Sequence, residues 1–138
     1  MAEKIPRTGS GSFQWNTAGW FGGQIGSTIW ILIAGILALF YNISVGLLGI
    51  SFFLLPNVIG YLLWHNRDRL EPYSAVQCLM ASIFLFAFFT FLAYDLSGLA
   101  SQLGPKSVRS YRNFYFILLL YPGLMIQFYF LNRGAKNK

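Results

Sequence analysis

Four amide side chains interrupt long apolar stretches of the chain and are its strongest candidates for binding chemistry. They are Gln24, Asn57, Gln77 and Gln127, one in each of four stretches. An amide group in hydrocarbon is costly unless another polar group hydrogen-bonds to it. At ~1.5 Å of helix per residue, the four lie at a similar depth, ~5 to 10 Å inside one face of a membrane. We therefore predict a shared polar layer, with Ser27 and Tyr61 as further members, that either joins the helices or binds an ion or small solute.

Two titratable residues at the ends of apolar stretches form a second candidate site. Asp95 is an acid inside such a stretch, where a carboxylate is a candidate for proton coupling or cation binding. Its position near the end of the stretch favours an ion pair with Lys106, Arg109 or Arg112 of the following loop. His65 lies at the opposite boundary, where it is either a polar helix end or a pH sensor, because imidazole titrates near neutrality.

Enzyme chemistry has few residues to work with. General acid and base catalysis needs paired titratable groups, and a hydrolytic triad needs a histidine beside a nucleophile and a carboxylate. The chain has one histidine and one cysteine, so a multi-cysteine metal site and an internal disulfide are excluded. We expect no catalytic residues, no metal site and no cofactor. The four acids are Glu3, Asp68, Glu71 and Asp95.

Composition places these residues in a membrane protein. The 138 residues are 56% hydrophobic and 10% charged, whereas a soluble domain is about 25% charged. A soluble domain of this length has too little interior to bury so much apolar surface. The net charge of +6 comes from basic residues between and beyond the apolar stretches. That distribution suits lipid headgroups and excludes a nucleic-acid-binding face.

The apolar stretches predict an all-α, integral membrane four-transmembrane-helix bundle that forms a single membrane domain over residues 1–138. The first stretch has 23 uncharged residues, which reach ~34 Å and exceed the ~30 Å hydrocarbon core. Residues 1–16 are expected to be a flexible tail and residues 132–138 a basic tail. The predicted helices are residues 19–41, 43–64, 74–96 and 113–131.

The distribution of basic residues predicts the orientation. Four crossings in an antiparallel, up-down arrangement put both termini and the middle loop on one side, with seven basic residues against three on the other. The positive-inside rule then places the N and C termini in the cytoplasm. We expect a multi-pass protein of a bacterial inner membrane or another plasma-type membrane.

Glycines predict where helices approach closely, because small residues let helix backbones pack in lipid. In the first helix the spacing gives overlapping small-xxx-small pairs, and in the second the glycines share one face with Asn57. We expect the two faces to meet across the first hairpin; the alternatives are a dimer seam or a thin wall beside a pathway. The glycines concerned are Gly19, Gly22, Gly23, Gly26, Gly46, Gly49 and Gly60.

Three functional hypotheses follow. The leading one is a noncatalytic accessory, scaffold or assembly subunit that contacts membrane lipids and forms a homo-oligomer or joins a larger membrane protein. The alternative is an oligomeric ion or small-solute channel or transporter that uses the polar layer. A further alternative is a membrane enzyme or a lipid or cofactor binder, with a cavity beside His65 or beside the face of Phe84, Phe88 and Phe91.

Overall fold

The computed structural model describes residues 13–102 and 115–136, and within these ranges every regular element is helical. Four helical segments are long and apolar enough to cross a membrane, the fourth being η1 and α6 taken together as Tyr115–Ala135. The predicted all-helical class with four candidate spans is confirmed, and the spans indicate a multi-pass membrane protein. The elements are α1 (Thr17–Leu39), α2 (Ile43–His65), α3 (Pro72–Leu96), α4 (Leu99–Gln102), the 3-10 helix η1 (Tyr115–Leu119) and α6 (Leu120–Lys136).

An asparagine determines where α1 begins. The Asn16 Oδ1 atom accepts the backbone N–H of Gly19 at 3.1 Å and so satisfies one of the amide groups left free at a helix start. As a result α1 begins at Thr17, before the expected residue 19. The ring of Phe13 packs against Tyr73 and Phe128, with centroids 5.7 and 5.2 Å apart, so residues 13–16 lie against the bundle instead of forming a free tail. Residues 1–12 of the expected tail lie outside the described residues.

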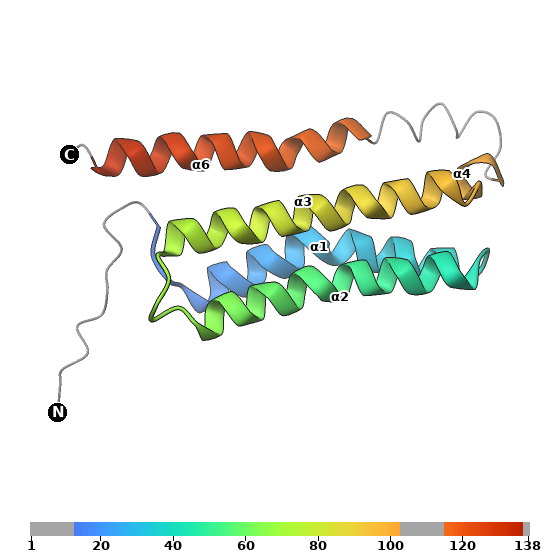
Figure 1. The fold of residues 1–138 in the computed structure, drawn as a ribbon, viewed down its shortest axis with the longest axis horizontal. Coiled ribbons are helices and arrows are strands. Elements are labelled where there is room, and N and C mark those ends of the chain that lie inside the picture. Colours follow the sequence, from blue (N-terminus) through green and yellow to red (C-terminus); the bar gives the residue numbers. More distant parts are fainter. Residues whose placement is uncertain (1–12, 103–114, 137–138) are drawn as a thin grey trace.

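A second asparagine turns the chain between α1 and α2. The backbone N–H of Asn42 donates to the carbonyl of Ala38 at 2.8 Å, and its Oδ1 accepts from Val45 N–H at 3.2 Å. One residue therefore ends one helix and caps the next. Helix α1 stops at Leu39, earlier than the expected residue 41, and the two helices form a tight hairpin (Figure 1).

The other boundaries also differ from the sequence-based ones. Pro72 begins α3, where its missing N–H costs nothing. The expected loop after α3 contains the short helix α4. The expected basic tail after residue 131 is helical as far as Lys136, in continuation of the apolar part of α6. The predicted start of the fourth helix at residue 113 lies outside the described residues.

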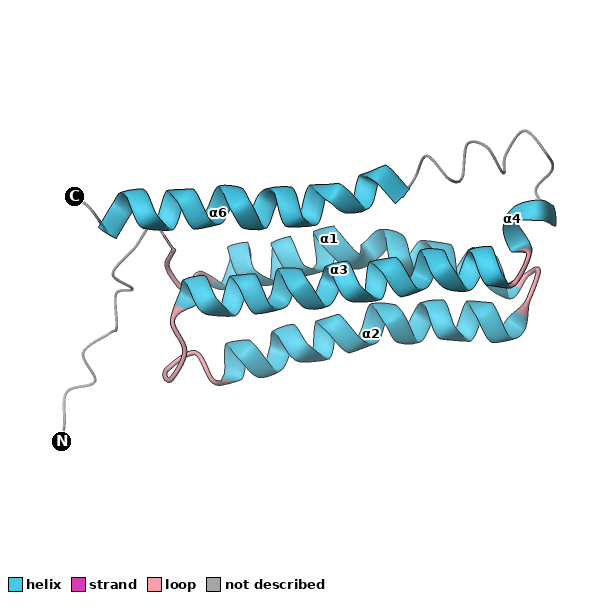
Figure 2. Cartoon of the chain, turned by 45° about the horizontal axis from the view of Figure 1, so that its top comes forward, coloured by secondary structure: helices cyan, strands magenta, loops and turns pink. Residues whose placement is uncertain are grey.

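The helices pack unequally (Figures 1 and 2). Helix α2 lies against both α1 and α3, whereas α6 packs along α3 and its backbone lies away from α1 and α2 in the described part of the chain. The core is centred on Ile31 of α1 and Ile83 and Ala87 of α3, which are fully buried. Large side chains such as Ile33 and Leu47 are more than half exposed, as expected for surfaces that face lipid.

Candidate functional site

The polar residues of α1 and α2 form one connected hydrogen-bond network. The Gln24 Nε2 group donates to the Asn57 carbonyl at 2.7 Å and to Asn57 Oδ1 at 3.0 Å. Asn57 Nδ2 donates to Thr28 Oγ1 at 3.0 Å and to the Phe53 carbonyl at 2.7 Å. The Thr28 hydroxyl donates to the carbonyl of Gln24 at 2.8 Å and so closes the network. Each of these hydrogen bonds is 3.0 Å or shorter, so the three side chains join the two helices directly and not through a ligand.

One atom of this network has no partner among the described residues. Gln24 is 3% exposed, and its buried Oε1 accepts no hydrogen bond there. The orientation of the amide follows from the network, because the Asn57 carbonyl can only accept and must face the Nε2 group. The whole amide lies against Gly60, where an added Cβ would be 2.4 Å from both Cδ and Oε1 and 2.7 Å from Nε2.

The glycines of α2 allow this close approach. An added Cβ at Gly49 would lie 2.8 Å from the Cα of Gly35, and one at Gly46 would lie 2.7 Å from the backbone nitrogen of Leu39. These are backbone atoms, which cannot move aside as a flexible side chain can. Gly46, Gly49 and Gly60 thus lie at the α1–α2 contact, opposite Gly35, Leu39 and Gln24.

The glycines near the start of α1 do not meet α2. Within the described residues, an added Cβ at Gly22, Gly23 or Gly26 would have no other atom within 4 Å, and Gly19 touches only Asn16 of its own cap. The expected intramolecular packing of this face is therefore wrong. Trp20 and Gln24, which alternate with these glycines along α1, do contact Gly60 and Asn57 of α2, so the glycines lie on a different face of α1. The close backbone crossing is at Gly35, opposite Gly49.

The other members of the predicted polar layer are separate from the network. Gln77 donates to the Met125 carbonyl of α6 at 2.9 Å, so it joins a different pair of helices. The Ser27 hydroxyl donates to the Gly23 carbonyl of its own helix at 2.7 Å. Gln127 and Tyr61 are exposed. The predicted single layer is therefore divided into an α1–α2 part and an α3–α6 part.

The two titratable candidates lie on the surface. Asp95 is exposed near the end of α3, and the three basic residues expected to pair with it lie outside the described residues. His65 is exposed, and its ring stacks on Tyr61 with centroids 6.3 Å apart. The Phe84 and Phe91 rings pack against Tyr121 and Trp30, whereas Phe88 is exposed.

A groove of about 400 Å³ lies between α1 and α6, and α3 forms its floor. The α1 wall includes Gly19, Gly23 and Gln24, and the α6 wall includes Leu124 and Phe128. Within the described residues the α6 backbone packs along α3 and not along α1, so the space beside α1 stays open in this half of the bundle. The groove's volume falls in the range typical of small-molecule sites, about 300 to 1,000 Å³.

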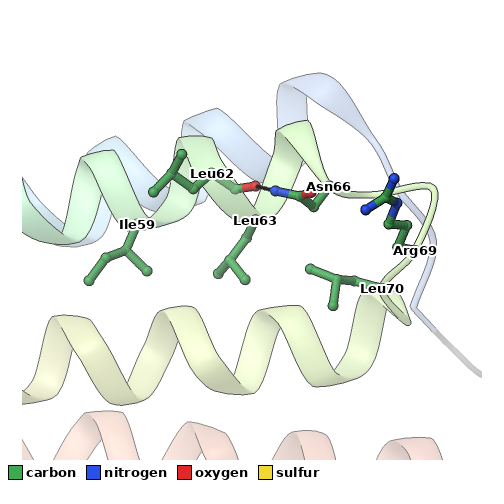
Figure 3. Close-up of a pocket in the computed structure, with 6 residues that line it drawn as sticks. All are labelled: Ile59, Leu62, Leu63, Asn66, Arg69 and Leu70. Atoms are coloured by element: carbon green, nitrogen blue, oxygen red, sulfur yellow. Dashed lines mark hydrogen bonds between the residues drawn. The ribbon is translucent and has the colours of Figure 1, made fainter.

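A smaller hollow of about 310 Å³ lies where α2 ends (Figure 3). Its walls are mainly apolar, from Ile59, Leu62, Leu63 and Leu70, with Asn66 and Arg69 at the loop end. Asn66 Nδ2 donates at 2.8 Å to the Leu62 carbonyl, which also accepts the backbone N–H of Asn66 at 3.1 Å, so the side chain reinforces the last turn of α2. An apolar wall with a cationic side chain at its loop end is typical of a protein surface at the boundary between membrane hydrocarbon and water.

Several residues of these sites were missed from the sequence. Thr28 stands four residues after Gln24, so helical spacing alone could have placed it beside the amide. Trp20, near the start of α1, donates from Nε1 to the Gly60 carbonyl at 3.1 Å and so forms a further link between α1 and α2. Tyr121 donates to the Ser27 carbonyl at 3.0 Å and accepts from Trp30 Nε1 at 3.1 Å, a contact between distant helices that no local pattern signals.

The described residues contain no group of three His, Cys, Asp or Glu side chains that could hold a metal ion. Hydrogen bonding between helices and contact with apolar surface are the chemistry that this arrangement offers. Comparison with known proteins finds no matching family, no similar curated protein and no similar solved structure.

Proposed function

We propose that the protein is a noncatalytic membrane protein that serves as an assembly subunit. In this proposal it associates with a second copy of itself through one face of α1. The observation that carries the proposal is the open space at Gly22 and Gly26, both exposed and without a neighbouring atom at the Cβ position in the described structure. Glycines at this spacing let two membrane helices approach closely.

The face continues along the helix. Ile29 and Ile33 follow Gly22 and Gly26 at steps of four, three and four residues, and they are 39% and 53% exposed. No charged residue occurs in α1, so two copies of the face can meet without burying a charge. A symmetric pairing of one face with itself closes as a dimer. The division of the polar layer into separate helix pairs also favours a packing role over a solute path.

Disulfide crosslinking in native membranes tests the proposal. In a Cys78→Ala background, cysteines placed at Gly22, Gly26, Ile29 and Ile33 should give covalent dimers. Val58→Cys, on an exposed position of α2, is the matched control and should stay monomeric. Crosslinking that is equal at all positions, or absent at the α1 positions, would contradict the proposal.

A leucine substitution separates close packing from mere proximity. Gly22→Leu adds a side chain where the monomer has space, so the fold should persist while dimerisation weakens at least tenfold, or ~1.4 kcal/mol. Dimers of unchanged affinity in this variant would place the interface elsewhere.

We further propose that the four spans run up and down through a plasma-type membrane with both termini in the cytoplasm. The basic residues of the tails and of the loop after α2 support this orientation. In the same cysteine-free background, Asp68→Cys should react with an impermeant thiol reagent only from the cytoplasmic side and Gln102→Cys only from the other. Reaction of both from one side would exclude this topology.

A further inference from the structure

We infer that the groove between α1 and α6 is a binding site for one acyl chain of a phospholipid from the leaflet next to the start of α1. The inference is independent of dimerisation, because the groove is lined by Gly23 and not by Gly22 or Gly26.

The length of the groove favours an acyl chain over a helix. Along α1 it runs from Gly19 to Ser27, or ~12 Å at ~1.5 Å per residue. Half of a ~30 Å hydrocarbon core is ~15 Å, so the groove is about as long as one leaflet is thick. A transmembrane helix of a partner needs a surface that crosses the whole bilayer, which is about twice as long.

The inner end of the groove is closed by side chains. The Tyr121 hydroxyl reaches across from α6 to the Ser27 carbonyl, and Trp30 bonds to the same hydroxyl. Beyond them the gap is filled by packed rings, with Trp30 and Phe91 5.5 Å apart and Phe91 and Tyr115 5.2 Å apart. One half of the space between α1 and α6 is thus filled by protein, and the other half is open.

The composition of the groove suits an apolar chain with a polar end. Its floor on α3 includes Val76, Leu79 and Met80, which offer only apolar contacts. Gln14 and Asn16, both exposed, line the opposite end, next to the start of α1 where the membrane boundary lies. Gly23 leaves space at the α1 wall, since a larger side chain there would extend into the groove.

Photocrosslinking tests the site. The full chain is reconstituted in phosphatidylcholine vesicles that contain a phosphatidylcholine with a diazirine midway along one acyl chain. Adducts on Met80, a half-buried residue of the groove floor, are compared with adducts on Leu54 and Leu55 of the exposed α2 face. We expect Met80 to be labelled as strongly as the α2 leucines despite its burial, because the groove admits a chain to it.

Matched variants give the decisive comparison. Gly23→Leu should lower the labelling of Met80 about tenfold by filling the groove and leave labelling of α2 unchanged. Gly22→Leu, one residue away and outside the groove, should change neither value, even if it weakens dimerisation. If Gly23→Leu fails to fold by circular dichroism, Leu124→Phe fills the groove from α6 and should give the same loss.

Three outcomes would overturn the inference. Met80 labelling that survives both groove-filling variants would mean that the chain reaches it by another route. Absent Met80 labelling in the wild type would show that no acyl chain enters. Absent labelling together with a Gly23→Cys disulfide between two chains would assign the groove to a second copy of the protein.

Discussion

Asn57 uses both ends of its amide group to join α1 to α2. Its Oδ1 accepts from Gln24, and its Nδ2 donates to Thr28 and to the Phe53 carbonyl of its own helix. Such bonds contribute modestly in a membrane, on average about 0.6 kcal/mol each, because the separated helices also find partners. The network therefore specifies how the helices meet more than it stabilises the fold.

Replacing Asn57 with leucine should lower the free energy of unfolding by about 1 kcal/mol, since two interhelical bonds are lost. Unfolding in mixed micelles, followed by circular dichroism during titration with a denaturing detergent, measures the change. Gln127→Leu is the control, because that amide is exposed on α6, and its loss should leave stability unchanged or slightly raised. Equal effects of the two substitutions would show that the network contributes nothing specific.

At the scale of elements, the α1–α2 hairpin depends on direct backbone contact. Gly35 and Gly49 meet so closely that a side chain on either would overlap backbone atoms of the other helix. The short turn at Asn42 keeps the two helices together near this crossing. The glycines of α2 therefore have a packing role, whereas those at the start of α1 leave a face open for other contacts.

Gly49→Ala should destabilise the protein by about 1 to 3 kcal/mol, because the helices must separate to admit the methyl group. Gly123→Ala on α6 has open space at its Cβ and should be neutral or stabilising, since alanine is the better helix former. The same detergent titration compares the two variants. A Gly49→Ala protein as stable as the wild type would rule out the close crossing.

At the scale of the whole molecule, α6 is the least firmly attached span. It packs along α3, and its described link to α1 is the side chain of Tyr121. Segments with few packed neighbours open at lower free energy than the rest of a fold. Opening of α6 is thus expected to precede global unfolding, and it would widen the groove.

Tyr121→Phe should make this opening easier by removing the hydroxyl that bridges Ser27 and Trp30. A loss of about 1 kcal/mol corresponds to roughly fivefold faster amide hydrogen exchange in α6. Exchange measured by mass spectrometry in nanodiscs should show the change in α6 and not in α2. Tyr129→Phe, which alters an exposed tyrosine of the same helix, should have no effect. Faster exchange throughout the bundle would indicate a general loss of stability instead.

The sequence by itself determined the helical class and the four candidate spans, because length and uncharged composition are local properties that lipid selects. It also indicated the turn at Asn42 and the pairing of Asn57 with another polar group, since an amide in hydrocarbon needs a partner. The tertiary structure alone decided which partner each group takes. Gln24 and Gln77 lie at similar depth, yet they join different helix pairs, and only the rotation of each helix about its axis determines this.

The glycines show the same division. Spacing identifies the faces that can pack closely, but the crossing at Gly35 depends on the angle and offset of two helices, and neither is encoded in a repeat. The groove arises because α6 rests on α3 and leaves half of α1 uncovered, which is a relation among three helices. Local composition determines that each helix is more stable in lipid than in water. The packing of the whole bundle decides which helix surfaces stay exposed to a lipid or to a protein partner.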